Sequence, residues 1–299
     1  MSDYLELARR GRNDWWRYLL SLPGILVTWL FVGSIPVVLF LAYVSMDGDP
    51  ATDFSGTGFV GVPVIVEFLV TMSSFVPFLV ATLLAVRFIH ARPLKTLMTG
   101  ESHVRWGRML AGAGVWLVIA ALLSLIESLL YPGRYVLTFQ PARLLLFALF
   151  ALILIPIQTS AEELFFRGYL LQWMGLRLKN IWLLSLLNGI LFFLPHAINP
   201  EMATNSLLIG SSYFATGFFL AFITLQDNGI ELALGMHAAN NLFAALFANY
   251  VVTALPSPSL FTVQELDPVY SLVGLIAGLI LFYLVFFHLT RSGTARRPD

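Results

Sequence analysis

The chain has 299 residues, of which 58% are hydrophobic and 11% are charged, and its mean hydropathy is +0.82. Soluble domains carry about 25% charged residues, so the composition excludes an ordinary soluble protein and indicates an integral membrane protein. The net charge of zero gives no reason to expect nucleic-acid binding, and the lack of cysteine excludes disulfides, thiolate metal sites and a cysteine nucleophile.

Apolar runs long enough to cross a hydrocarbon core, which takes about 20 residues, recur along the whole chain. The first run follows a polar start and has no small-residue cleavage pattern, so it is expected to stay as a span and not to be a removable signal peptide. The sequence predicts an all-α, polytopic bundle of about eight transmembrane helices, at 21–46, 63–86, 109–131, 143–161, 181–198, 206–226, 231–253 and 268–289.

Lysine and arginine gather in alternate loops, and positively charged loops are retained on the cytoplasmic side of a membrane. All but two of the 17 basic residues fall before span one, at 87–108, after span four or at the end of the chain. The exceptions, Arg134 and Arg143, belong to loops that otherwise carry acidic residues. We therefore expect both termini to be cytoplasmic, with a cytoplasmic segment at 1–20, one transmembrane domain at 21–290 and a basic cytoplasmic tail at 291–299.

Ionisable side chains inside a membrane are costly, so each one needs a partner, a water-filled cavity or a task. The stretch AEELFFRGYL, residues 161–170, places Glu163 and Arg167 four residues apart on one helix face, where they can pair. Glu162 points about 100° away. Either both acids make ordinary salt bridges near the interface, or Arg167 neutralises Glu163 and leaves Glu162 in a cavity, suited to proton transfer.

Two later spans contribute histidines. The segment FFLPHAINP places Phe192 and His196 one turn apart around Pro195, and GMHAANNLF places His237 and Asn241 on one face. Proline kinks a helix and frees a backbone carbonyl, which favours a cavity near His196. Taken alone, each segment is also explained by packing and by hydrogen bonds between helices.

Together the three segments offer carboxylates, histidines and amides, a set that is sufficient for hydrolysis. A carboxylate can take a proton from water, a histidine can orient that water or protonate a leaving amine, and histidine and asparagine donors can stabilise an oxyanion. The predicted boundaries, however, place Glu162 at the cytoplasmic end of span four and His196 at the outer end of span five. Either span four continues beyond 161, or span five begins later and the proline kink brings His196 inward.

The residues match three motifs in order: E-E-x-x-x-R as Glu162, Glu163 and Arg167, F-x-x-x-H as Phe192 and His196, and H-x-x-x-N as His237 and Asn241. Over about 140–255 the chain resembles the CPBP family, the CAAX-protease and bacteriocin-processing (Abi) family of intramembrane proteases, which includes the Ras-converting endopeptidases. The resemblance implies that Glu162 is the catalytic glutamate and that His196 helps it to activate water. It also implies that Glu163 and Arg167 support them, that His237 and Asn241 stabilise the oxyanion, and that Phe192 shapes the pocket.

The resemblance implies metal-free, glutamate-dependent hydrolysis, so no cofactor is expected. Zinc is the lesser alternative, because two histidines and a carboxylate can bind it, although the chain has no H-E-x-x-H pair. The segment 210–213 does not give a G-x-S-x-G serine elbow either. The expected partners are the lipid bilayer and a peptide or lipidated protein substrate, prenylated or not, and no nucleic acid. The expected location is the inner (plasma) membrane of a bacterium, with a cytoplasm-facing active site.

Two other classes of function compete with a peptidase. A non-catalytic immunity or scaffold protein would keep the same fold, although every motif position is intact here. A proton- or metal-coupled transporter would use the same buried acids, but the chain shows no inverted repeat of broken helices. Glu67 and Glu127, inside spans two and three, are expected to form hydrogen bonds between spans or to line an access path.

Overall fold

The apolar runs form helices, because a backbone in hydrocarbon can satisfy its N–H and C=O groups only within the helix itself. The computed structural model describes residues 3–54 and 58–289. Its α-helices are α1 (Asp3–Glu6), α2 (Trp15–Val27), α3 (Ile35–Met46), α4 (Val64–Ser73), α5 (Phe75–Leu84), α6 (Trp106–Leu130), α7 (Pro141–Glu163), α8 (Leu171–Gly175), α9 (Ile181–His196), α10 (Ser206–Asp227), α11 (Glu231–Leu246) and α12 (Pro268–Leu284).

Short turns of other helix types extend or join these helices. The 3₁₀ turns are η1 (Leu7–Arg10), η4 (Leu94–Leu97) and η6 (Pro200–Ala203), and the π-helical turns are η2 (Thr28–Val32), η3 (Ala85–Ile89), η5 (Leu164–Leu170) and η7 (Val285–Leu289). Three helices begin at a side-chain cap: the oxygens of Asn180, Asn205 and Asp267 accept backbone N–H groups at the starts of α9, α10 and α12.

Each predicted span corresponds to a helical segment. Six segments of the described chain are long and apolar enough to cross a membrane, at Trp15–Met46, Val64–Ile89, Trp106–Leu130, Pro141–Gly175, Ser206–Asp227 and Pro268–Leu289. The other two, α9 and α11, have only 16 residues each. The last of these was predicted too long, because α11 ends at Leu246 and not near 253. A helical membrane protein is therefore confirmed, while eight crossings stay a prediction.

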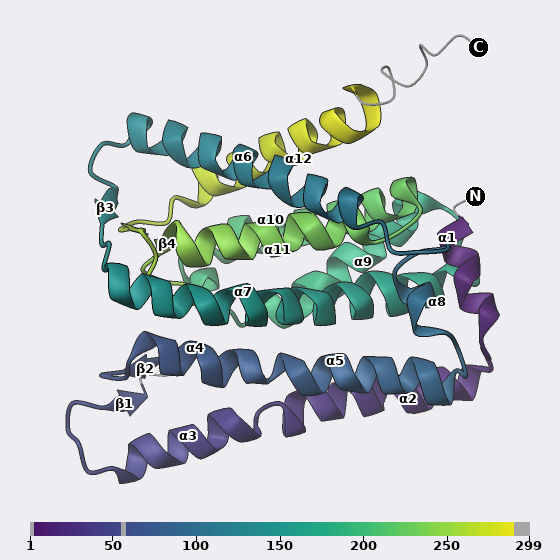
Figure 1. The fold of residues 1–299 in the computed structure, drawn as a ribbon, viewed down its shortest axis with the longest axis horizontal. Coiled ribbons are helices and arrows are strands. Elements are labelled where there is room, and N and C mark those ends of the chain that lie inside the picture. Colours follow the sequence, from purple (N-terminus) through teal and green to yellow (C-terminus); the bar gives the residue numbers. More distant parts are fainter. Residues whose placement is uncertain (1–2, 55–57, 290–299) are drawn as a thin grey trace.

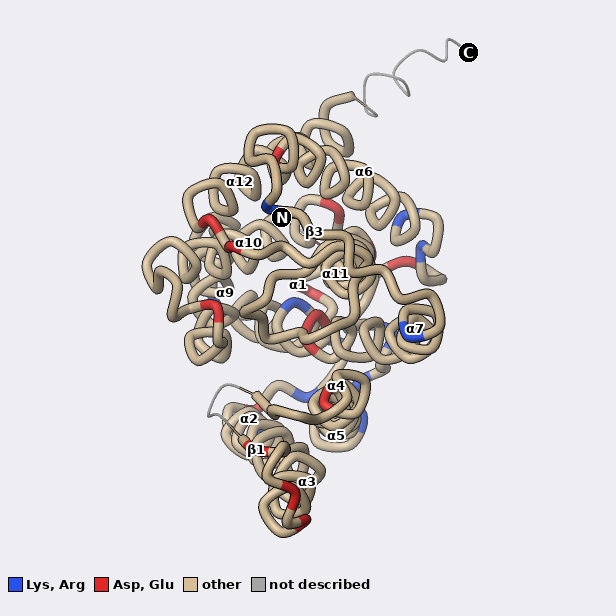
Figure 2. The backbone as a smooth tube through the Cα atoms, turned by 90° about the vertical axis from the view of Figure 1, so that its left-hand side faces the viewer, with Lys and Arg blue, Asp and Glu red and all other residues tan. Residues whose placement is uncertain are grey.

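The helices form two groups that lie side by side (Figures 1 and 2). Helices α2 to α5 make the first group, and α5 and α4 pack on α7 of the second. In the second group α11 lies between α6 and α7, and α10 packs on both α9 and α12. The candidate site residues are therefore on central helices, and the first group covers one side of α7.

The connecting loops add two small sheets, which the all-α prediction did not include. Strands β1 (Asp53–Phe54) and β2 (Phe59–Val60) form an antiparallel hairpin between α3 and α4. Strand β5 (Phe261–Val263) pairs antiparallel with β3 (Tyr135–Leu137) and parallel with β4 (Ala248–Tyr250). The three-stranded sheet thus joins the loop after α6 to the loop between α11 and α12.

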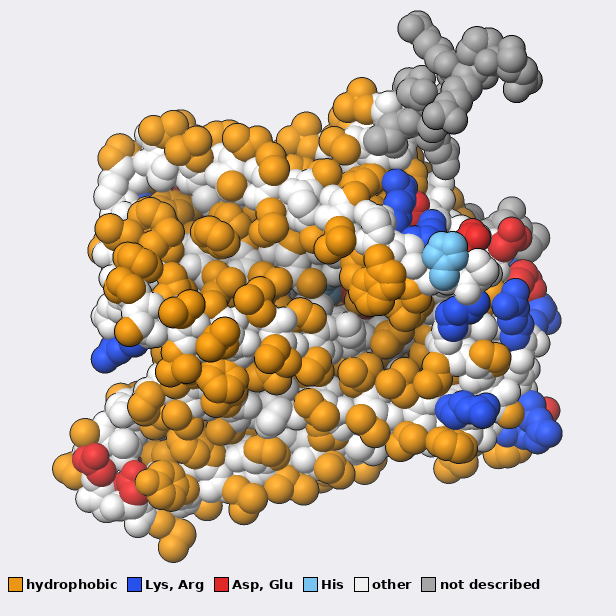
Figure 3. All heavy atoms as spheres, in the orientation of Figure 1, with side chains coloured by type: hydrophobic (Ala, Val, Ile, Leu, Met, Phe, Trp, Pro, Cys, Tyr) orange, Lys and Arg blue, Asp and Glu red, His pale blue; other side chains and the backbone are white. Residues whose placement is uncertain are grey.

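Most lysine and arginine side chains gather at one end of the bundle, with some acidic side chains among them, and other acidic side chains lie at the opposite end (Figure 3). We call the end with α1, the loop at 90–105 and the loop at 176–180 the basic end. The opposite end, with the loops at 47–63, 131–140, 197–205 and 247–267, is the acidic end. The N-terminal helix and the end of α12 both lie at the basic end (Figure 1). The predicted basic tail at 291–299 lies outside the described residues, and the cytoplasmic orientation of the basic end stays a prediction.

Candidate active site

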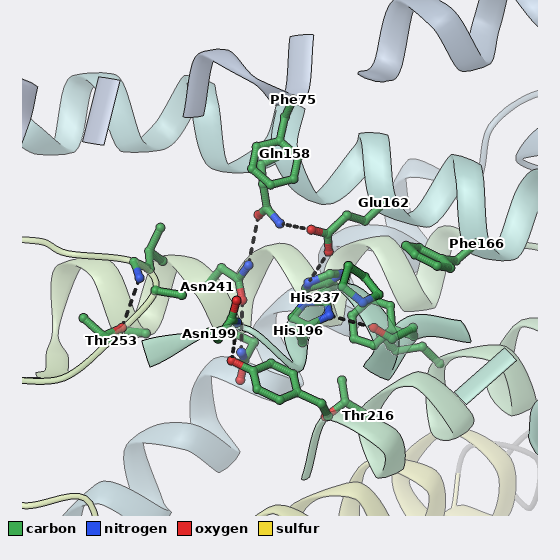
Figure 4. A pocket seen from close by; sticks show the side chains of 18 of the residues that line it. Phe75, Gln158, Glu162, Phe166, His196, Asn199, Thr216, His237, Asn241 and Thr253 are labelled. Carbon is green, nitrogen blue, oxygen red and sulfur yellow. Dashed lines mark hydrogen bonds and ion pairs between the residues drawn. The ribbon is translucent and has the colours of Figure 1, made fainter. Parts of the chain in front are cut away.

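A cavity of about 360 Å³ lies between α7, α9 and α11. The side chains of Glu162, Phe192, His196, His237 and Asn241 all line it, and Figure 4 shows how those of α7, α9 and α11 converge. The residues of the three sequence motifs are therefore brought together in space. Glu163 and Arg167 lie behind the cavity wall, where both side chains are completely buried.

The continuation of α7 explains how Glu162 and His196 reach the same depth. The predicted end of span four at 161 is wrong, because α7, η5 and α8 form one helical segment from Pro141 to Gly175. At 1.5 Å per residue, Glu162 lies roughly 20 Å along this segment from Gly175, and His196 roughly 22 Å along α9 from Ile181. The segment Pro141–Gly175 ends at the basic end and α9 begins there, so Glu162 and His196 lie at a similar depth and the first of the two alternatives holds.

The longer helix also changes the place of Arg167. The positive-inside pattern predicted this residue in a cytoplasmic loop, but it lies inside the π-helical turn η5 and has no exposed surface. Its Nη1 donates to Glu163 Oε1 at 2.9 Å, as the four-residue spacing predicts. Its guanidinium also lies 4.4 Å from the centre of the Phe192 ring. Phe192 therefore contacts the cation of the first motif, in addition to shaping the cavity.

His237 is held between the two glutamates. Its Nδ1 lies 2.7 Å from Glu163 Oε1, the same oxygen that accepts from Arg167. A carboxylate only accepts hydrogen bonds, so Nδ1 carries the proton of this bond. The other ring nitrogen, Nε2, lies 3.5 Å from Glu162 Oε2. The paired Glu163 and Arg167 thus fix the orientation of a histidine that faces the first glutamate.

One carboxylate oxygen of Glu162 is held by a hydrogen bond, and the other has no hydrogen-bond partner among the described residues. Its Oε1 accepts a hydrogen bond of 2.7 Å from Gln158 Nε2, one turn earlier on α7. Its Oε2 is buried and makes no hydrogen bond with the described residues. Because Glu162 is only 5% exposed and lines the cavity, Oε2 is the acceptor available to a molecule that enters there.

A chain of hydrogen bonds leads from Glu162 through the three amides of Gln158, Asn241 and Asn240 to Trp116 on α6. Asn241 Nδ2 donates to Gln158 Oε1 at 3.0 Å, and Asn240 Nδ2 donates to Asn241 Oδ1 at 3.1 Å. At the far end Trp116 Nε1 donates to Asn240 Oδ1 at 3.1 Å. An indole can only donate and a carboxylate can only accept, so the two ends of the chain fix the direction of every amide between them.

His196 is also fixed by its neighbours. Its Nδ1 lies 2.7 Å from the Phe192 carbonyl, which can only accept, so Nδ1 carries a proton and Nε2 is the remaining ring nitrogen. The imidazole packs against the ring of Tyr213, with centroids 4.5 Å apart. The Tyr213 hydroxyl accepts from Asn199 Nδ2 at 2.8 Å and donates to Glu201.

The comparisons with known proteins agree with this geometry. A family model described as type II CAAX prenyl endopeptidase, Rce1-like, matches residues 141–243, which contain all three motifs. The uncharacterized protein YyaK of Bacillus subtilis is 34% identical over 276 residues, covering 91% of each chain. The chain belongs to the Rce1-like CAAX protease family. No solved structure matches this Rce1-like chain.

Several residues of the Rce1-like site were not predicted from the sequence as site residues. Gln158 had a signal that was overlooked, since it precedes Glu162 by four residues and therefore shares its helix face. Tyr213 was considered only within a rejected serine motif. Trp116 had no signal at all, because it belongs to an apolar span with no motif, although it lines the cavity and donates to Asn240.

A second cavity of about 330 Å³ continues the Rce1-like site toward the acidic end. The two cavities share the lining residues Trp116, Glu201, Tyr213, Thr216, Asn240, Ala244, Thr253 and Leu275. Glu127 lines the second cavity, and its carboxylate accepts from Arg134 at 3.0 Å and Tyr135 at 2.7 Å. Glu67 lies elsewhere and accepts the Phe59 backbone N–H at 3.1 Å. Both acids thus have structural partners.

Proposed function

We propose that this protein is an intramembrane endopeptidase in which Glu162 activates water to cleave a peptide bond. The observation that carries the proposal is the carboxylate oxygen Oε2 of Glu162, which is buried in the cavity without a hydrogen bond to the described residues, between two oriented histidines. A general base needs such an open acceptor within reach of the proton that it abstracts. Membership of a protease family agrees with this chemistry.

The reaction follows from the available atoms. Glu162 Oε2 accepts a proton from water, His196 Nε2 helps to orient that water, and the water oxygen attacks the carbonyl carbon of the substrate. The carbonyl oxygen then gains negative charge, which the second Nδ2 hydrogen of Asn241 stabilises together with an Nε2–H of His237, so that this imidazole carries a proton on both nitrogens. The proton held by Glu162 passes to the amide nitrogen as the C–N bond breaks, so that a carboxylic acid and an amine leave. Glu163 and Arg167 hold His237 in place and take no part in bond making.

The proposed reaction uses no metal ion. Among residues 3–54 and 58–289, no group of three His, Cys, Asp or Glu side chains has the arrangement to hold one. His237 further supports this proposal, because its Nδ1 is engaged by Glu163 and its Nε2 already faces Glu162. A zinc-dependent protease is the alternative that chelation tests.

The proposed substrates are peptide segments of membrane-associated proteins in a bacterial plasma membrane. Apolar side chains such as Trp29, Met72, Phe75 and Leu255 form much of the wall of the catalytic cavity, and its polar groups gather around Glu162. The cavity and its neighbour together give room for several substrate residues, because each exceeds 300 Å³. Such walls suit apolar residues on either side of the cleaved bond, with or without a lipid anchor.

A cleavage experiment with purified protein tests the proposal. Wild type and Glu162→Gln in detergent are incubated with a library of quenched fluorescent peptides, lipidated and unlipidated, with and without a strong chelator. Cleavage by wild type that survives chelation and is lost in Glu162→Gln is expected, and a reaction in H₂¹⁸O should place one ¹⁸O in the new carboxylate. Loss on chelation would restore the zinc mechanism. No cleavage by folded wild type would favour the non-catalytic scaffold.

A further inference from the structure

The basic end of the molecule is closed above the catalytic cavity. Every residue from Ala161 to Gln172 is buried, and the N-terminal helix α1 packs on this segment. Tyr4 has no exposed surface, and its hydroxyl donates to the Leu97 carbonyl at 2.5 Å and lies 3.2 Å from that of Arg167. These contacts place the start of the chain directly over the helix that carries Glu162.

Two glycines show how tightly this end is packed. A Cβ atom on Gly175 would lie 2.5 Å from the Leu5 side chain, and one on Gly168 would lie 2.8 Å from the Leu97 carbonyl. Separations below 3.0 Å cannot be tolerated without movement, so α1 and η4 approach the helix as closely as a backbone allows. Within the described part of the chain, no residue of α1, η1 or η4 lines the catalytic cavity.

The cavity wall instead reaches the loops of the acidic end. Asn199 and Glu201 come from the loop after α9, and Thr253, Ala254 and Leu255 from the loop after β4. The two loops are joined, because Glu201 Oε2 accepts the Ala254 backbone N–H at 2.9 Å. Figure 4 shows Asn199 and Thr253 on the same side of the site.

The short α9 helix explains why these loops come so close to Glu162. Its 16 residues span about 24 Å, less than the ~30 Å of a hydrocarbon core. The chain therefore leaves the helix directly after His196, and the loop at 197–205 begins at the depth of the catalytic residues. On α11, which forms another wall of the cavity, Asn240 is exposed, although it lies in the middle region of the helix and lines both cavities. An exposed amide on a central helix indicates an open approach from this side.

We propose that peptide substrates reach Glu162 through the acidic end of the molecule, past the joined loops at 197–205 and 247–267, and not through the basic end. This inference rests on the proposed function, because only a peptidase has a peptide substrate. The route into the cavity is a property of the fold and can be tested without cleavage. It replaces the expectation that the active site opens at the basic end, where the sequence places the cytoplasm. The substrate class is an apolar peptide segment, anchored in the membrane or exposed at its surface, that is presented at the acidic end.

Cysteine accessibility tests the route, because the natural chain has no cysteine. Ala244 lines both cavities and is not part of the catalytic machinery, so Ala244→Cys reports on the cavity. Ala233→Cys on the same helix is the matched buried control, since Ala233 has no exposed surface. Asp49→Cys and Ser102→Cys mark the exposed acidic and basic ends. Thr253→Cys, at the mouth, is a second reporter if Ala244→Cys does not fold.

Each variant is treated with the small, membrane-impermeant reagent sulfonatoethyl methanethiosulfonate in right-side-out and in inside-out membrane vesicles. The unreacted thiol is then counted with a mass-tag maleimide after denaturation. The expected result is that Ala244→Cys reacts in the vesicle orientation that exposes Asp49→Cys, at least about tenfold faster than Ala233→Cys. The two end markers also report which end faces the cytoplasm.

Reaction of Ala244→Cys only in the orientation that exposes Ser102→Cys would overturn the proposal, and so would no reaction in either orientation. Labelling does not depend on cleavage, so a failure of the peptidase proposal would leave this result unchanged. If cleavage is found, modification of Ala244→Cys is expected to abolish it, while modification of Asp49→Cys is expected to leave it unchanged.

Discussion

The chain of hydrogen bonds from Trp116 to Glu162 predicts a graded loss of activity. Gln158→Leu removes the bond to the Glu162 carboxylate, and bonds to charged groups contribute about 1.5–3 kcal/mol. Trp116→Phe removes only the first, neutral bond of the chain, worth about 0.5–1.5 kcal/mol. Since 1.36 kcal/mol is a factor of ten in rate, kcat should fall roughly 13- to 160-fold in the first variant and roughly 2- to 13-fold in the second.

The loss in Trp116→Phe arises from the direction of the amides. Without the donor-only indole, nothing forces Asn240 to point its oxygen toward α6, so Asn240 and Asn241 can turn and withdraw the donor that holds Gln158. Trp29→Phe is the matched control, because Trp29 lines the same cavity and packs on Phe78 without belonging to the chain.

The assay is the initial rate of peptide cleavage at several substrate concentrations, with thermal unfolding in detergent as the check on folding. A positioning role lowers kcat and leaves KM nearly constant. Equal rates for Trp116→Phe and Trp29→Phe, or a kcat for Gln158→Leu within twofold of wild type, would show that the chain of amides does not position Glu162.

Three further predictions concern the surroundings of this chain. Arg167→Met leaves the buried Glu163 carboxylate without its arginine partner and with only the His237 hydrogen bond, and it should destabilise the fold by about 3–5 kcal/mol. Thermal unfolding in detergent measures this, and an unchanged midpoint would contradict it. Tyr213→Phe keeps the ring against His196 but loses the hydroxyl contacts to Asn199 and Glu201. Tyr213→Ala loses the ring and the hydroxyl contacts, so cleavage should fall more in this variant. Equal cleavage rates in the two variants would show that the stacked ring does not position His196. Prolonged dialysis against a chelator should leave the cleavage rate of wild type unchanged, and recovery of a lost rate by added zinc would instead establish a metalloprotease.

Local spacing determined how much of the site could be predicted from the sequence. Glu163 and Arg167 pair because four residues on a helix bring side chains together, and the same geometry places Phe192 beside His196. Each of the three motif segments places polar side chains in a membrane span, where they are costly without a partner. The three segments could therefore be assigned to one shared site.

The remaining features depend on contacts between distant segments. Hydropathy ended span four at 161 because Glu162, Glu163 and Arg167 interrupt the apolar run, although pairing allows these charges to lie inside the protein. The contact between His237 and Glu163 joins residues that are 74 positions apart, so no local pattern records it. Trp116 could not be found either, since an indole in an apolar span has no feature that distinguishes it from a packing residue.

The most direct test of the account is the turnover rate of Glu162→Gln on the best peptide from the library, with wild type measured in the same detergent and at the same temperature. The substitution keeps the shape of the side chain and its bond to Gln158 but removes the base. General-base catalysis contributes about 10²–10⁴-fold, so the account predicts that kcat falls at least ~100-fold while the thermal unfolding midpoint is retained. A folded Glu162→Gln protein that cleaves within tenfold of the wild-type rate would contradict the central claim.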